Sequence, residues 1–154
     1  MRNTPQESAA LVRRFLTDVV GGGDTAAIDA FLTDDPVDYN LVFGETAGQD
    51  AMTTLGWRVL AAADVGVDIN DIVATGERVA VRATVTGTHT ESLVDLAPTG
   101  ASFEIDHVWF CRIHDGCIAE IWSLPDGLGL LQQLGALPEP SVNRRRAERN
   151  QYPE

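Results

Sequence analysis

The feature that most constrains the fold is a strict alternation of residue types in the second half of the chain. From residue 78 to residue 89, apolar or small residues occupy every second position: Val79, Val81, Ala83 and Val85. The residues between them are polar: Arg82, Thr84, Thr86 and Thr88. A period of two residues predicts a β-strand with one buried face. His89 shares the phase of the apolar set, so we expect its side chain to point toward the core or a pocket.

Two further segments extend this strand into a sheet. After Asp64, Val67, Ile69 and Val73 predict a preceding strand, which ends at the turn Thr75-Gly76-Glu77. Downstream, Pro98-Thr99-Gly100 turns the chain into a β-hairpin. We expect antiparallel pairing throughout, because short turns join these strands.

The hairpin turn His114-Asp115-Gly116 is typical of a three-residue loop, in which Gly116 supplies the positive φ. This loop predicts four facing pairs: Ile113 with Cys117, Cys111 with Ala119, Trp109 with Ile121, and His107 with Ser123. One face then carries Ile105, His107, Trp109, Cys111, Ala119, Ile121 and Ser123. The other carries Asp106, Val108, Phe110, Arg112, Ile118, Glu120 and Trp122. A two-residue turn would instead bring His107 opposite Leu124 and turn Ser123 away.

The second hairpin face mixes charges with large apolar groups, as in a sheet surface partly covered by another subunit. We therefore interpret Trp122 as an interface residue and expect Glu120 to be solvated or paired with Arg112. The chain is predicted to form a homodimer or homotetramer.

The N-terminal part is predicted to be helical. Thr4-Pro5-Gln6-Glu7 is a capping box with proline at the first helical position, and the helix should end at Gly21-Gly22-Gly23. Asp24 should cap a second helix that runs through Leu32. A third helix is predicted over residues 49–63, and Asp126 should cap a last one. The predicted apolar stripes consist of Leu11, Phe15, Leu16 and Val19; Ile28, Phe31 and Leu32; Met52, Leu55, Val59 and Leu60; and Leu128, Leu131 and Leu134.

Helices followed by antiparallel strands predict an α+β fold, in which a curved antiparallel sheet wraps on N-terminal helices and encloses a pocket at its open end. We assign residues 1–137 to this single domain. Residues 138–154 contain three prolines and four arginines, and we interpret them as a polar, Arg-rich, solvated tail. An anion-binding or subunit-clasping arm is the alternative.

Charge limits the partners that the protein can have. There are 23 acidic residues against 11 basic ones, all arginine, which gives a formal net charge of −12. Such a charge repels nucleic acids and anionic membranes, and it is typical of a halophilic or GC-rich organism. The N-terminus has no signal-like apolar run and no segment is long enough to span a bilayer, so we expect a cytoplasmic location.

Neither cysteines nor histidines indicate a metal or a disulfide. Cys111 and Cys117 are not opposite each other in the predicted register, and we expect both to be small buried residues in a reducing compartment. The three histidines have no short ligand spacing. We therefore predict no metal site.

The segments GTHTESLVDLAPTG (residues 87–100) and RIHDGCIAEIWSLPDGLGLLQQLGALP (residues 112–138) resemble the SnoaL-like polyketide cyclases of the nuclear transport factor 2-like superfamily. The resemblance covers about residues 5 to 138, and DGLGLLQQLG is its most distinctive part. It implies an α+β cone with a deep apolar pocket, assembly through the outer sheet face, and no metal or organic cofactor. It also implies intramolecular aldol chemistry with a carboxylate as acid and base.

This sequence departs from the family pattern at the catalytic position. Where the cyclases carry their acid/base aspartate this chain has Ser123, and the two facing polar positions, usually Gln and His, are His107 and Trp109. Serine alone is no base. The resemblance therefore implies a pocket with a different catalyst.

We identify His107, Ser123 and Asp38 as candidate catalytic residues. His107 is the candidate base, with Ser123 as its hydrogen-bond partner or as an oxyanion donor. The alternative is a buried histidine satisfied by a serine hydroxyl. Asp38, Tyr39 and Asn40 are expected in a loop after the second helix, where they could place a carboxylate and a phenol at the pocket mouth. The resemblance places a ligand-holding amide in this loop, and a simple turn is the alternative.

Trp109 could stack on a flat ligand, and His89 is either a ligand contact or a satisfied core histidine. Together these residues predict binding of a small hydrophobic or carbonyl-bearing ligand, in a cyclase or isomerase that needs no cofactor. A non-catalytic binding module of the same fold is the alternative. An epoxide-hydrolase-like activity ranks last, because it needs two carboxylates and an arginine that the inner hairpin face lacks.

Overall fold

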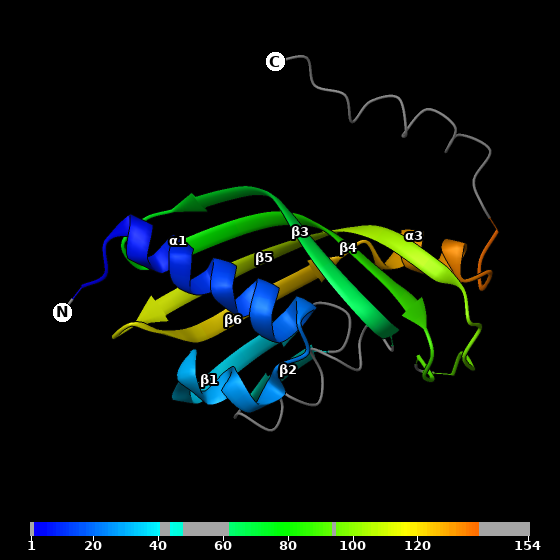
Figure 1. The fold of residues 1–154 in the computed structure, drawn as a ribbon, viewed down its shortest axis with the longest axis horizontal. Helices are drawn as coiled ribbons and strands as arrows, with labels where there is room; N and C mark the ends of the chain where they lie inside the picture. The colour runs from blue at the N-terminus through cyan, green and yellow to red at the C-terminus, as the bar shows by residue number, and fades with distance from the viewer. Residues whose placement is uncertain (1, 41–43, 48–61, 94, 139–154) are drawn as a thin grey trace, which may run out of the picture.

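The computed structural model describes residues 2–40, 44–47, 62–93 and 95–138. It consists of a six-stranded sheet in the order β2-β1-β6-β5-β4-β3, with helical segments before and after it in the chain (Figure 1). The strands are β1 (Leu32–Asn40), β2 (Gly44–Ala47), β3 (Ala62–Ala74), β4 (Arg78–His89), β5 (Ser102–His114) and β6 (Cys117–Pro125). The helical elements are α1 (Pro5–Arg14), η1 (Phe15–Gly21), η2 (Thr25–Ala30) and α3 (Gly127–Gln133).

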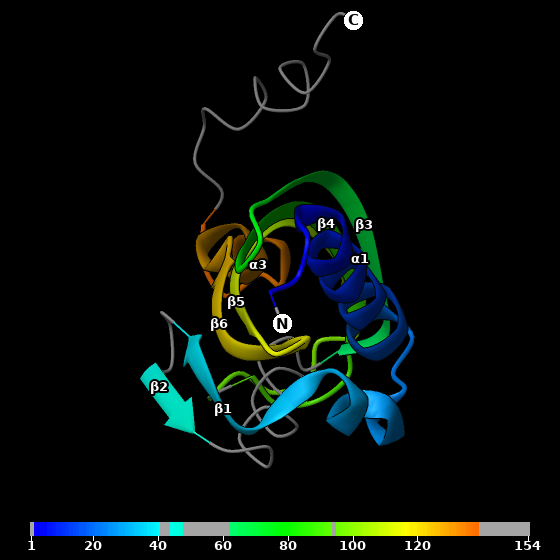
Figure 2. The ribbon, with the colours of Figure 1, turned by 90° about the vertical axis from the view of Figure 1, so that its left-hand side faces the viewer.

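The sheet curls around one interior. Figure 2 looks along the strands and shows β6, β5, β4 and β3 following an arc, with α1 on its open side. The α+β prediction is therefore confirmed. No helix in the described ranges is long and apolar enough to cross a membrane.

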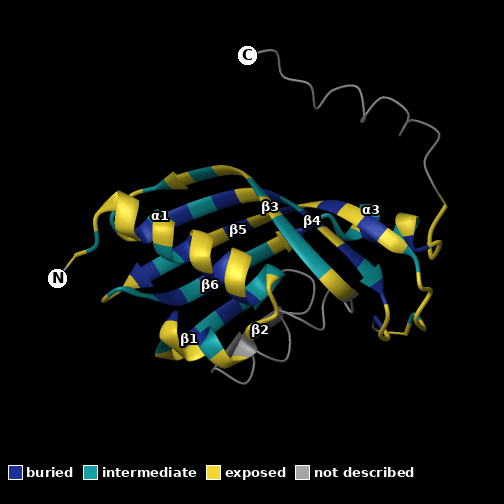
Figure 3. Cartoon of the chain, viewed as in Figure 1, coloured by how far each residue is buried: buried dark blue, intermediate teal, exposed yellow. Residues whose placement is uncertain are grey.

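The alternation that predicted the central strands is present in the structure. In β4 and β5, every second residue is buried, and the buried and exposed bands alternate along these strands in Figure 3. We call the buried side the inner face; it carries Val79, Val81, Ala83, Val85, His89, Ile105, His107, Trp109 and Cys111. The opposite side is the outer face.

The first helix begins as predicted. The Thr4 hydroxyl accepts a hydrogen bond from Glu7 N–H at 3.2 Å, and Glu7 Oε2 accepts one from Thr4 N–H at 2.8 Å. The helix then widens into the π-helical turns of η1 and ends beside the predicted glycines. Its buried side packs Val12, Phe15, Leu16 and Val19 against the sheet.

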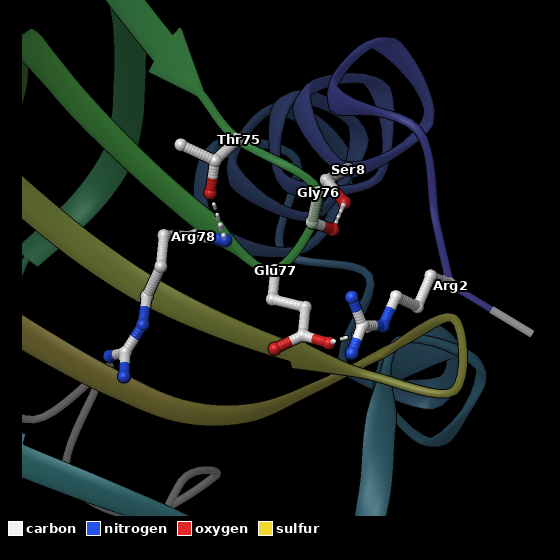
Figure 4. Close-up of polar contacts among 6 residues, drawn as sticks. All are labelled: Arg2, Ser8, Thr75, Gly76, Glu77 and Arg78. Carbon is white, nitrogen blue, oxygen red and sulfur yellow. Dashed lines mark hydrogen bonds and ion pairs between the residues drawn. The ribbon is translucent and has the colours of Figure 1, made fainter.

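Helix α1 also contacts the turn that joins β3 to β4. The buried Ser8 hydroxyl donates to the carbonyl oxygen of Gly76 at 2.7 Å, in the turn that joins β3 to β4 (Figure 4). Arg2 lies 3.8 Å from Glu77 in the same turn, but both side chains are exposed. The buried serine bond is thus the contact that holds the helix in register with the turn.

The second helical segment is shorter than predicted. It is a 3₁₀ helix over Thr25–Ala30, and the Asp24 side chain makes no capping hydrogen bond. Leu32 already belongs to β1, although Ile28 and Phe31 are buried as expected. Six residues form too short a segment for a stable α-helix, so packing on the sheet decides its form.

The segment after η2 was predicted as a loop, and this prediction is wrong. Residues 32–40 form β1, which pairs with β6 in parallel and with β2 antiparallel. The sheet is therefore mixed rather than wholly antiparallel. The turn-like sequence Asp34-Asp35-Pro36 falls between Leu32 and Val37, where the β1–β6 register is interrupted and proline can be accommodated.

Strand β3 is present as predicted, but it begins earlier, at Ala62, and its register shifts along its length. Val73 is 67% exposed, because the register shift between Ile69 and Asp71 turns Ile72 inward in its place. A bulge inserts one residue and reverses the faces beyond it. The predicted third helix, residues 49–63, falls almost entirely outside the described residues, as does the tail after Pro138.

Candidate functional site

The β5–β6 hairpin does not have the predicted register. His114 pairs with Cys117, so the turn is the two-residue Asp115-Gly116, with φ values of +46° and +80°. Two successive positive φ values are typical of a type I′ turn, whose twist matches that of the strands. The three-residue loop predicted from the sequence is wrong.

A bulge then compensates for this shift. Ile113 pairs with Ile118, whereas Arg112 pairs with Glu120, so Ala119 is an additional residue in β6. Ile118 and Ala119 are both buried, and the prediction that Ile118 faces outward is therefore also wrong. Together the turn and the bulge displace the pairing by two residues, and a displacement of two leaves the faces unchanged.

The predicted contact between His107 and Ser123 survives this change. Ser123 now lies opposite Trp109, and His107 lies opposite Pro125. Ser123 nevertheless shares the inner face with His107, and its Oγ lies 2.7 Å from His107 Nε2. A diagonal contact thus replaces the predicted cross-strand one.

His107 is almost completely buried, with 4% of its surface exposed. Its ring stacks on Trp109, with centroids 3.8 Å apart and planes inclined by 9°. Burial lowers its pKa to about 3, so the imidazole is neutral at physiological pH. Its second nitrogen, Nδ1, has no hydrogen-bond partner among the described residues.

Asp38 lies on the inner face of β1 and is also 4% exposed. It pairs with Ile121, which in turn pairs with Cys111 on β5. Burial raises the pKa of Asp38 to about 6. Burial, and secondarily the charge of Asp38, raise the pKa of the Cys111 thiol to about 12. Cys111 is therefore protonated and unreactive, while Asp38 titrates near neutrality.

Asp38 and Ser123 lie on neighbouring strands of this face. Ser123 is two residues beyond Ile121, the partner of Asp38, so ideal sheet spacings put the Cα atoms of Asp38 and Ser123 about 8 Å apart. A carboxyl group and a hydroxyl group thus share one inner surface. In the backbone register, Asn40 is the residue paired with Ser123.

His89 occupies the other end of the inner face and is fully buried. Its Nδ1 accepts a hydrogen bond from Thr99 N–H at 3.1 Å and lies 3.0 Å from Thr99 Oγ1. The ring therefore fixes the Pro98-Thr99-Gly100 turn against β4. Its Nε2 has no hydrogen-bond partner among the described residues.

Tyr39 lies on the outer face, not at a pocket mouth as expected. Its ring stacks on Trp122 at 4.8 Å, and Phe110 meets Trp122 edge-on at 5.8 Å. Arg112 and Glu120 form the predicted ion pair at 2.6 Å. Because neighbouring residues of a strand point to opposite faces, placing Asp38 inward places Tyr39 outward.

Asp126 and the two cysteines have structural surroundings rather than a place among the candidate catalytic residues. Asp126 caps α3, since its carboxylate accepts a hydrogen bond from Gly129 N–H at 3.0 Å. Cys111 and Cys117 are both free, although Cys117 is only half-buried. Within the described ranges, no group of three or more His, Cys, Asp or Glu side chains could hold a metal ion.

Three surface cavities are lined by described residues, and none of the three includes Asp38, His107 or Ser123. One, of about 600 Å³, lies between α1 and the hairpin turn, where Arg2, Leu11 and Gly116 contribute to it. A second, of about 540 Å³, lies over the β4–β5 end beside α3, and a smaller one lies beside Gly76.

The sequence pattern that defines the SnoaL-like polyketide cyclases matches residues 10–134. The chain belongs to this SnoaL-like family. Solved structures agree with the assignment. A candidate SnoaL-like polyketide cyclase from Jannaschia sp. CCS1 superposes with a TM-score of 0.79 over 87% of this chain and 95% of that one. Its sequence identity is 17%, so it shows the shared fold alone.

Two Streptomyces proteins are more similar in sequence to this SnoaL-like chain. AclR, a candidate hydroxylase from Streptomyces galilaeus, is 27% identical with a TM-score of 0.77, covering 94% of this chain and 91% of AclR. IdmH, a candidate polyketide cyclase from Streptomyces antibioticus, is 26% identical with a TM-score of 0.69, covering 84% of this chain and 99% of IdmH. Among curated protein sequences, none matches this chain.

Proposed function

We propose that this SnoaL-like protein binds a small carbonyl-bearing ligand on its inner face and catalyses proton transfer at the carbon next to the carbonyl, without a cofactor. Asp38 is the group that takes and returns the proton. The His107 ring contacts the ligand oxygen, and Ser123 holds this ring through the 2.7 Å contact between its Oγ and His107 Nε2. This chemistry would serve a cyclase or an isomerase.

The observation that carries the proposal is the position of Asp38. A carboxyl group that is 4% exposed, with a pKa raised to about 6, can exist in both protonation states near neutral pH. General acid–base catalysis is most effective when the pKa of the group lies near the working pH. Asp38, on β1, thus supplies a carboxylate to an inner face whose β6 residue Ser123 offers only a hydroxyl group.

His107 suits a different role. A pKa of about 3 makes the neutral imidazole a weak base, so it is a poor proton acceptor. A neutral ring can still donate or accept a hydrogen bond. We therefore transfer the role of base from His107 to Asp38 and keep His107 as a ligand contact.

A non-catalytic binding module of the same fold is the second candidate. The dense packing of the inner face favours it: Trp109 and Ile121, beside His107 and Asp38, are each 4% exposed. An epoxide-hydrolase-like activity is not favoured, because the inner positions of β5 and β6 carry neither an arginine nor a carboxylate.

The two candidates are separated by a proton-exchange assay. We would incubate 2-tetralone, a flat aromatic ketone, with the protein in deuterium oxide and follow loss of its α-proton signals by NMR. Catalysed exchange should rise through pH 6 as Asp38 ionises. Asp38→Asn should reduce it by about 100-fold or more.

The matched control is Asp35→Asn, which alters an exposed carboxylate on the same strand and should leave exchange unchanged. Equal exchange rates in the parent and in Asp38→Asn would exclude Asp38 as the base. Binding of the ketone without any catalysed exchange would favour the non-catalytic alternative.

We also propose that the protein forms a homodimer or homotetramer through its outer face. Phe110 is 41% exposed, Val108 40% and Leu124 49%, next to the stacked Tyr39 and Trp122 rings. Contiguous apolar surface of this kind is typical of subunit interfaces.

A further inference from the structure

Two buried histidines on the inner face have the same kind of surroundings. In His89 and in His107, one ring nitrogen contacts a threonine or serine and the other has no hydrogen-bond partner among the described residues. A neutral imidazole carries its hydrogen on only one nitrogen. The group that contacts the bonded nitrogen therefore determines what the other nitrogen can offer.

The tautomer of His89 follows directly from its partner. The backbone N–H of Thr99 points at Nδ1 from 3.1 Å, and an N–H group can only donate. Nδ1 must then be the unprotonated nitrogen. The hydrogen of His89 is on Nε2.

His107 faces a hydroxyl group, which can donate or accept. If Nε2–H donated to Ser123 Oγ, the serine hydrogen and the Nδ1 lone pair would both lack partners among the described residues. If Ser123 donates to Nε2 instead, only the Nδ1 hydrogen is left. Ser123 is only half-buried, but the second arrangement leaves fewer polar groups without a protein partner, and we take it for His107.

We propose that Ser123 fixes His107 as the Nδ1–H tautomer, and that this hydrogen is the donor for the carbonyl oxygen of the ligand. The inference rests on the proposed function and specifies the ligand group that the site recognises. Ser123 is then a positioning residue, which acts through the ring.

The chemistry of the site agrees with this role. When Asp38 removes a proton next to a carbonyl, negative charge develops on the carbonyl oxygen. A preorganised neutral N–H donor in a buried site stabilises this charge without giving up its proton. The low pKa of His107 keeps the ring neutral throughout the physiological range.

The tautomers can be read directly from long-range proton–nitrogen NMR correlations of the ¹⁵N-labelled protein at pH 7. We expect His107 to carry its hydrogen on Nδ1 and His89 on Nε2, so that one spectrum contains both patterns. His107→Asn assigns the signals. In Ser123→Ala, the His107 signals should change to a mixture of tautomers while those of His89 remain the same.

The role of the donor is tested with two probes of the same shape. 2-Tetralone carries a carbonyl group, and tetralin does not. Titration with 2-tetralone should move the Nδ1–H resonance of His107 downfield, and tetralin should not. Binding of 2-tetralone should weaken less than about threefold in His107→Asn, whose amide nitrogen replaces Nδ1, and about tenfold in His107→Gln.

Several results would overturn the inference: an Nε2–H tautomer at His107, an unchanged His107 tautomer in Ser123→Ala, or no response of the Nδ1–H resonance to the ketone. The NMR measurements need no turnover. If the Asp38→Asn variant catalysed exchange of the 2-tetralone α-protons as fast as the parent, the proposed function would fail. The NMR signals of the His107 ring would still test the tautomer and the donor contact independently.

Discussion

Asp38 and His107 have opposite pKa shifts, and each shift makes a prediction about stability. The folded pKa of Asp38, about 6, lies above its ordinary value of 3.8. Between these values the folded state binds more protons than the unfolded state, so the contribution of Asp38 to stability falls as the pH rises from 3.8 to about 6 and is constant at higher pH. The Asp38→Asn variant does not show this pH-dependent loss of stability, because an amide does not ionise.

We therefore expect Asp38→Asn to gain about 1 to 2 kcal/mol in unfolding free energy relative to the parent as the pH increases from 4.5 to 8. Urea denaturation at both pH values measures the difference. Asp35→Asn, at an exposed position, provides the control and should show no such trend. A difference that is independent of pH would contradict the raised pKa.

His107 behaves in the opposite way. Its folded pKa, about 3, lies below the ordinary 6.5, so the unfolded state binds more protons between these values. Its contribution to stability is complete above about pH 6.5 and is lost as the pH falls toward 3. This is the expected behaviour of a histidine that is buried in its neutral form.

His107→Asn should therefore lose less stability than the parent on acidification. Between pH 7 and pH 4, the unfolding free energy of the parent should fall by about 3 kcal/mol more than that of the variant. The reason is that the unfolded parent takes up a proton on the His107 ring, which the variant lacks. His114→Asn, at an exposed ring in the hairpin, is the control. Parallel losses in the parent and in His107→Asn would argue against a neutral buried ring.

At the scale of elements, the bond between Ser8 and Gly76 connects α1 to the β3–β4 turn. The Ser8 side chain is fully buried, so removal of the hydroxyl leaves the Gly76 carbonyl group without this donor. We expect Ser8→Ala to lower the unfolding free energy by about 1 to 2 kcal/mol. Thermal or urea unfolding measures this change.

Thr17→Ala is the matched control, because its hydroxyl donates within the helix to the Arg13 carbonyl oxygen at 2.8 Å and is exposed. It should change stability by less than about 0.5 kcal/mol. Similar losses in the two variants would mean that the tertiary bond adds nothing to a local one.

At the scale of the whole molecule, the outer face is the surface that we propose for self-association. Phe110 packs against Trp122 and lies under the Arg78 guanidinium, 5.9 Å from it. Phe110→Glu would place a charge in the centre of this apolar surface. We therefore expect the dissociation constant of the oligomer to increase at least tenfold. Sedimentation velocity over a concentration series measures this.

Val73→Glu provides the control, since Val73 is 67% exposed on β3, two strands away from β5. It should leave the sedimentation coefficient unchanged. A parent protein that is monomeric at all concentrations would remove the proposed interface.

The sequence by itself determined the fold class, the first helix, the central strands and the residues of the inner hairpin face. Period-two alternation and a capping box are local signals, because they depend on the geometry of one strand or one helix end. The same reasoning placed His89 and His107 inside. It also paired Arg112 with Glu120.

Only the tertiary structure decided the strand at Asp38, the parallel pairing of β1 with β6, and the hairpin register. Asp34-Asp35-Pro36 has the composition of a turn, yet the edge of β6 provides partners that make its surroundings a strand. The contact between His107 and Ser123 was predicted through the wrong register and is present because the tight turn and the bulge shift the pairing by two residues. Pairing between distant segments depends on the free energy of the assembled sheet, which no local sequence pattern specifies.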